Sequence, residues 1–373
     1  MLRVVGGAEL PPVVEGATQP FVGVTTDGIP IAGLSELRDA GAPTASAAEA
    51  ATSFLNCLSV SLRGSGQLPL DAAEWRMWIN AFLTFPEYGL LLQELSHDER
   101  EAALNVIRTS ISSIGFERVR EVMRLNGVLG ELTGGYSDTL TEFCYRFTVF
   151  GDPSPEEPWG WQLQGHHLAL NCVFVAGQAV LTPMFLGVEL GGEELFAEHQ
   201  RRARELMNSL TSNQRDRALL HGSMLTAELP PQLAGIVDGR HRAGAGRDNL
   251  VLPYEGLAGA SLTPGQRELL AALTDPYLDT LPEEPRAHRR RQVLRHLDAT
   301  RLAWIGPWAE GTPFYYRVHS PVLLVEYDNH AGIFLDNDEP EPFHVHTIVR
   351  TPNGGDYGKD LLRRHYAHEH ATE

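Results

Sequence analysis

Lysine is nearly absent from this chain. Of its 30 basic residues, Lys359 is the only lysine and the other 29 are arginines, so chemistry that needs a catalytic lysine has one candidate. The 48 acidic residues outnumber the basic ones and give a formal charge of −18, which repels phosphate backbones. The one basic run, residues 286–295, is too local to offset this charge. We therefore expect neither lysine chemistry nor nucleic-acid binding.

Cysteine and long apolar runs are scarce as well. The three cysteines lie far apart without a Cys-x-x-Cys pair, which excludes a four-cysteine metal site and a disulfide framework. The most apolar stretch, residues 172–188, is interrupted by polar residues and falls short of the roughly 20 residues of a membrane helix. No apolar signal segment occurs near the N-terminus. These features predict a cytoplasmic protein with a small-molecule substrate and no membrane partner, and they leave the oligomeric state open.

The pattern along the chain predicts one α+β unit. Residues 1–45 are rich in Gly, Pro, Ala and Thr, as in an extended arm, and residues 46–373 are expected to form a single catalytic domain. Apolar residues at helical spacing and a Ser96/Glu99 capping box indicate a mainly helical N-terminal third. An antiparallel β-sheet core covered by helices is expected to follow. Helices are expected at 47–62, 71–83, 193–210, 263–273, 283–297 and 358–366, and strands at 143–150, 159–170, 172–175, 178–181, 302–305, 314–318, 322–327 and 343–349.

Histidine is abundant near the C-terminus: seven of the fifteen histidines follow position 318. His344 and His346 are two residues apart in a predicted strand, so both side chains project from the same face. Two imidazoles about 6–7 Å apart at Cα can converge on one ion at metal–nitrogen distances of about 2.0–2.1 Å. The pair indicates a metal site, although a hydrogen-bonded structural role is the ordinary alternative for any one histidine.

A second pair, His166 and His167, lies in the segment 159–171. Strand alternation predicts that Trp161, His167 and Asn171 share one face, while Gln164 and His166 share the other. Only one of the two histidines can then enter a given site, and the alternation does not say which.

Further candidates follow the next strands. Glu326 and Asp328 share a face, and each could ligate a metal, orient an imidazole or take a proton. In the last helix, His365 can reach the sheet if Leu361 packs inward. His368 and His370 are expected to belong to a polar tail.

Four ordered blocks then carry a resemblance: WGWQLxGHHLxLN at 159–171, FYYRV…VLLVEYDN at 314–329, HVHTxxR at 344–350 and DYGxDLLRRHY at 356–366. Together they resemble the family known as domain of unknown function 3500, from about residue 45 onward. The resemblance implies no reaction, but it implies that the blocks belong to one site. The family pattern matches at His166, His167, Asn171, Glu326, Asp328, Asn329, His344, His346, Arg350, Asp356 and His365. A longer insertion between Asn329 and His344 departs from the family spacing.

The leading hypothesis is an enzyme with a mononuclear, imidazole-rich metal centre. The ion would be bound by His344, His346 and one of His166 or His167. His365 or Glu326 would complete its coordination. An all-imidazole set suits copper, zinc or iron. The aromatic residues near these blocks in the sequence favour an oxygen-using oxidoreductase. The candidate substrate-binding residues are Trp161, Gln164, Asn171, Tyr327 and Asn329.

Three alternatives remain. In a zinc-dependent hydrolase of a small acidic substrate, Glu326 or Asp328 would be the general base and Arg350 would bind the anionic group. The protein could instead be a non-catalytic metal-binding or ligand-binding protein. The third alternative is an enzyme without a metal, in which a histidine beside a carboxylate carries out acid/base catalysis.

Overall fold

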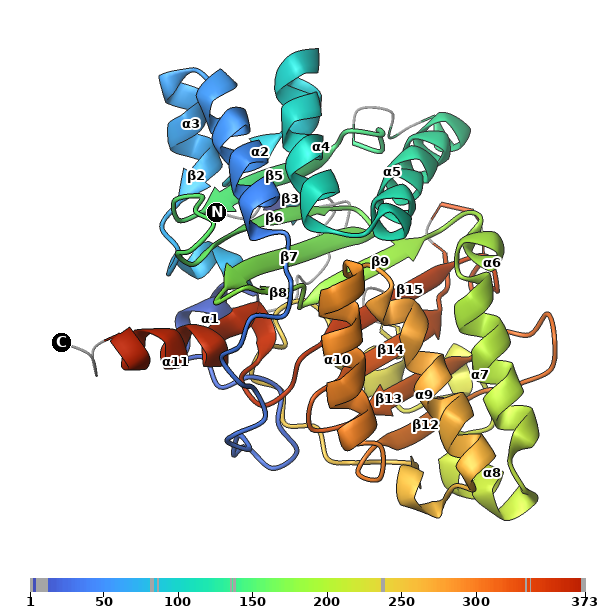
Figure 1. Ribbon diagram of the computed structural model, residues 1–373. Coiled ribbons are helices and arrows are strands. Elements are labelled where there is room, and N and C mark those ends of the chain that lie inside the picture. Colours follow the sequence, from blue (N-terminus) through green and yellow to red (C-terminus); the bar gives the residue numbers. More distant parts are fainter. Residues whose placement is uncertain are drawn as a thin grey trace.

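The core of the protein is one large mixed β-sheet (Figure 1). The computed structural model describes residues 3–4, 13–80, 84–85, 87–134, 136, 139–235, 239–332, 334–335 and 337–369. The strands are β1 (Arg3–Val4), β2 (Gln67–Leu68), β3 (Thr84–Phe85), β4 (Leu90–Leu91), β5 (Tyr145–Phe150), β6 (Trp159–Gly165), β7 (Leu168–Val175), β8 (Gln178–Val180), β9 (Met184–Val188), β10 (Leu219–His221), β11 (Leu257–Ala258), β12 (Arg301–Ile305), β13 (Tyr315–His319), β14 (Leu324–Asn329) and β15 (Val345–Arg350). The helices are α1 (Val13–Thr18), α2 (Thr44–Cys57), α3 (Val60–Gly66), α4 (His97–Ser110), α5 (Ser113–Thr133), α6 (Gly192–Leu195), α7 (Ala197–Ser209), α8 (Ser212–Ala218), α9 (Pro264–Leu278), α10 (Glu283–Arg295) and α11 (Lys359–Glu369).

Two halves, each mostly antiparallel, make up the sheet. Its order is β10-β12-β13-β14-β15-β9-β7-β6-β5-β2, with β11, β4 and β8 attached to β12, β5 and β7. The halves join where β15 pairs antiparallel with β9, with His346 opposite Gly187. The turn at Ala176 and Gly177 connects β7 to β8 as a hairpin, as the sequence predicts. The β2–β5 and β10–β12 pairings are parallel, so the sheet is mixed rather than wholly antiparallel.

Side-chain alternation gives the sheet two different faces. Helices α2, α4, α5, α7, α9 and α10 cover the apolar face (Figure 1), which carries Trp161, Leu163, Tyr327 and Val345 in one hydrophobic core. We call the other face the polar face. Segments 75–80 and 239–256 and the start of α11 cover it, and Phe185, Ile348 and Leu361 form a second, smaller core there. The predicted α+β fold, a sheet covered by helices, is confirmed.

The predicted helix starts are mostly correct. Ser96 and Glu99 form the expected capping box. Thr263 and Gln266 form another, with Pro264 as the first residue of α9. The expected helix over 47–62 is divided into α2 and α3 because the side chain of Ser59 caps a second helix start.

The helix predicted at 71–83 is wrong. Only a short 3₁₀ turn, Ala73–Arg76, forms, and residues 81–83 lie outside the described residues. Side chains of the sheet bind this backbone instead: Gln162 donates to the carbonyl of Trp75, and Gln164 accepts from the amide of Ile79. The mainly helical N-terminal third is therefore confirmed only in part. None of the helices described is both long and apolar enough to cross a membrane.

Candidate metal centre

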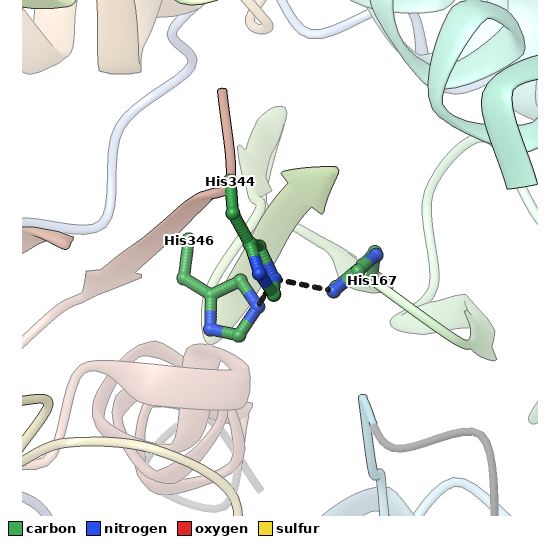
Figure 2. A group of neighbouring side chains, drawn as sticks. All are labelled: His167, His344 and His346. Atoms are coloured by element: carbon green, nitrogen blue, oxygen red, sulfur yellow. Dashed lines mark hydrogen bonds between the residues drawn. The ribbon is translucent and has the colours of Figure 1, made fainter. Parts of the chain in front are cut away.

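Three histidine side chains converge at the junction of the two half-sheets. His167 lies in the turn between β6 and β7, His344 immediately precedes β15, and His346 lies within it. The Nε2 atom of His344 is 3.3 Å from Nε2 of His167 and 3.0 Å from Nε2 of His346 (Figure 2). One ring nitrogen from each residue lies within 4.8 Å of the other two. All three side chains are buried. We call this group the triad.

The spacing within the triad fits metal coordination. Two nitrogens bound to one ion at about 2.0–2.1 Å and tetrahedral angles are about 3.3 Å apart. The observed separations of 3.0 and 3.3 Å match this value. The triad could therefore hold one metal ion.

The electrostatic environment favours the form that binds metals. Burial lowers the pKa of His167, His344 and His346 well below 6.5, and the neighbouring imidazoles lower it further. Neutral imidazole, which has a free nitrogen lone pair, is the metal-ligating form of histidine. The triad is thus prepared to ligate at neutral pH.

His167 is held in an uncommon backbone conformation. Its φ is +61°, in the left-handed region, where residues other than glycine are uncommon. Its amide donates to the carbonyl of Asn80 (3.0 Å), and its carbonyl accepts from the amide of Gly187 (2.8 Å). Strain of this kind persists where surrounding contacts enforce it, and it is concentrated at functional sites.

The turn corrects the predicted alternation. Because β6 ends at Gly165, His166 and His167 do not continue a strand, and their rings stack at 3.8 Å instead of pointing to opposite faces. The turn also places Asn171 on the polar face with Gln164, away from Trp161. The ring of His166 instead lies 2.7 Å from the side-chain oxygen of Asn126 on α5. The triad thus includes His167.

Gly187 provides the space for His346. The two residues are directly opposite each other on β9 and β15. A Cβ at Gly187 would lie 2.7 Å from the carbonyl oxygen of Val345 and 3.0 Å from Cδ2 of His346. Only glycine fits this position without displacing the imidazole.

Two further histidines flank the triad. The ring of His330 stacks on His346 at 4.4 Å, and that of His241 does so at 5.7 Å. Nδ1 of His330 is 3.3 Å from Oδ2 of Asp328. His241 is buried as well, in a segment whose sequence has no regular period to indicate it. His330 was missed, although it directly follows the EYDN block.

The two predicted carboxylates differ in their surroundings. Asp328 is directly opposite His346 across β14 and β15, and its Oδ2 accepts the amide of Arg240 (3.2 Å). Glu326 accepts the hydroxyl of Tyr315 at 2.6 Å and two backbone amides, those of residues 242 and 243. Asp328 therefore lies beside the triad, whereas Glu326 anchors the covering segment.

Arg350 is occupied by groups of its own chain. It forms ion pairs with Asp248 (2.6 Å) and Asp356 (3.1 Å), and it donates to two backbone carbonyls. It is fully buried. Its guanidinium therefore joins these segments of the polar face to one another.

Three of the predicted substrate-binding residues point away from the triad. Trp161 and Tyr327 belong to the apolar face, where Trp161 donates to Ser110 (2.9 Å). Asn329 accepts the amide of Phe314 (3.0 Å) and donates to the carbonyl of Pro342 (3.2 Å).

Gln164 and Asn171 belong to one hydrogen-bond network on the polar face. Gln164 donates to Gln162 (2.7 Å), and Gln162 donates to Asn171 (2.6 Å), within a buried network on the polar face. Gln164 also accepts the amide of Ile79 (3.1 Å). The next residue, Asn80, supplies the carbonyl that holds His167.

The last predicted ligand lies elsewhere. His365 is on α11 with its Nε2 3.9 Å from a carboxylate oxygen of Glu157, so the structure does not bring it to the triad. His368 is exposed on the same helix, and His370 lies outside the described residues.

Comparison with known proteins gives a family but no relative of known activity. Residues 40–359 match the model of the family described as Protein of unknown function (DUF3500). No curated protein and no solved structure matches the chain. Because the match covers most of the chain, the protein belongs to the DUF3500 family.

Proposed function

We propose that this protein is a metal-dependent enzyme whose single transition-metal ion is bound by His167, His344 and His346. The observation that carries the proposal is the convergence of three buried, neutral imidazole nitrogens at coordination spacing. Catalytic metal sites typically use three protein ligands and leave a position for water or substrate. Three imidazoles without cysteine suit zinc, copper or iron.

The neighbouring residues support hydrolysis as the first candidate reaction. A bound ion of this kind polarises a substrate oxygen and lowers the pKa of water to about 7. Asp328 lies 3.3 Å from Nδ1 of His330, whose ring stacks on His346. A carboxylate that orients an imidazole in this way makes it a competent proton acceptor beside the centre.

The structure weakens the earlier reason for preferring oxidation. Trp161, Tyr327 and Tyr366 favoured an oxygen-using oxidoreductase by their position in the sequence. Trp161 and Tyr327 lie on the apolar face, on the opposite side of the sheet from His346, and Tyr366 is exposed on α11. Oxidation therefore becomes the second candidate, to be decided by the identity of the metal.

Elemental analysis of protein purified without a histidine tag tests the proposal. We expect one zinc ion per chain in the wild-type protein and a loss of metal in the His344→Ala/His346→Ala variant. The control is His199→Ala, which removes an equally buried histidine packed between Phe196 and Tyr277. Copper or iron would redirect the proposal to oxidation. Equal metal contents in all three proteins, or no metal in any, would refute it.

A further inference from the structure

Arg240 carries a buried positive charge without a negative partner among the described residues. It is 2% exposed, and no carboxylate of the described residues lies within 4.0 Å of its guanidinium. Its Nη2 donates to the carbonyl of Met224, while its Nε has no hydrogen-bond partner in the described part of the chain. A guanidinium stays protonated in proteins, so burial without a counter-charge is costly.

Other buried arginines near this face are compensated. Arg350 is paired with two aspartates, Arg76 with Asp248, and Arg317 with Glu255. Arg240 differs from these three because its guanidinium contacts a backbone carbonyl and no acid of the described part of the chain.

The segment that contains Arg240 lies over the triad. The amide of Arg240 donates to Oδ2 of Asp328 (3.2 Å), and Asp328 is opposite His346. A Cβ at the preceding Gly239 would lie 2.4 Å from Nδ1 of His330. The following residue, His241, stacks on His346.

Several buried polar atoms of the triad and of the residues around it lack a hydrogen-bond partner in the described part of the chain. Buried polar atoms almost always have hydrogen-bond partners, so each exception needs an explanation. Oδ1 of Asp328, Nε2 of His241 and the Nδ1 atoms of His344 and His346 are buried and lack a partner among the described residues. Nε of Arg240 is an unused donor and Oδ1 of Asp328 an unused acceptor, so both could bind a polar ligand.

We infer that the ligand of this centre is a small molecule carrying an oxyanion, such as a carboxylate, and that Arg240 is the residue that recognises it. The inference rests on the proposed function, because it assigns the substrate class of the same metal site. A guanidinium binds an oxyanion through two parallel hydrogen bonds.

Anion binding to the full-length protein loaded with cobalt(II) tests this role. Acetate and inorganic phosphate are titrated, with acetamide as the neutral control, and the visible spectrum of the cobalt is recorded. We expect saturable changes with an oxyanion and none with acetamide. Arg240→Gln should weaken binding at least tenfold, and Arg240→Lys should weaken it less. Arg289→Gln, on α10 over the apolar face, should bind as the wild type does.

The possible outcomes separate the inference from the proposed function. Circular dichroism and cobalt content establish that each variant is folded and loaded; if Arg240→Gln does not fold, Arg240→Lys decides. Cobalt binding without an oxyanion response, or an Arg240 variant that binds like the wild type, overturns the inference and leaves the metal centre in place. If the wild type binds no cobalt, the proposed function fails. Anion-dependent thermal stabilisation of the metal-free wild type and variants then tests Arg240 by itself.

Discussion

Acidifying the metal-free protein should destabilise it through His319, a buried histidine on β13 outside the triad. Burial lowers the pKa of His319 from 6.5 to about 3, and nearby Arg317 adds to the effect. Between these two values the unfolded chain binds a proton that the folded protein does not bind, so stability falls as the pH drops below about 6.5. At pH 5 the loss from this one group is about 2 kcal/mol, because each pKa unit corresponds to about 1.4 kcal/mol.

Urea unfolding at pH 7, 6 and 5 in the presence of a chelator measures this loss. We compare the wild type with His319→Gln, which has a similar polar side chain that does not titrate. The drop in unfolding free energy between pH 7 and pH 5 should be about 2 kcal/mol smaller in the variant. Identical pH dependences in the two proteins would show that His319 is protonated in the folded state, which contradicts its burial.

Three substitutions test the site and its support. Gly187→Ala should displace His346 and lower the metal content, whereas Gly265→Ala, with no atom within 4 Å of its added Cβ, should not; equal metal contents would refute the packing argument. His167→Asn should lose metal with little change in the melting temperature of the metal-free protein, because asparagine tolerates a positive φ; retained metal would exclude His167 as a ligand. Arg350→Met should cost about 3–5 kcal/mol in urea unfolding, because it leaves Asp356 without a counter-charge and Asp248 with Arg76 alone, and a loss below about 1 kcal/mol would contradict that ion-pair role.

Local patterns in the sequence predicted part of this site. The convergence of His344 and His346 follows from strand alternation alone, which needs only two residues and their spacing. The capping boxes could be predicted for the same reason, since a cap depends on residues three apart.

The remaining features depend on contacts between distant segments. The turn after Gly165 resets the alternation, and no periodic pattern signals where a strand ends. His241 and Arg240 belong to a segment without regular structure, whose position is set by backbone amides that donate to Glu326 and Asp328. Asp248, the partner of Arg350, lies 102 residues away in the sequence. The sequence therefore contains no sign of this ion pair, and Arg350 was predicted to bind substrate.

The junction of β9 and β15 has a consequence for how the protein matures. His167 and His344 are 177 residues apart, so an ion bound between them would close a loop whose chain entropy is of the order of 5 kcal/mol. A growing chain that has not yet reached residue 344 contains His167 but only one third of the triad. Metal uptake would therefore follow the synthesis of residue 344 and would report that β15 has paired with β9.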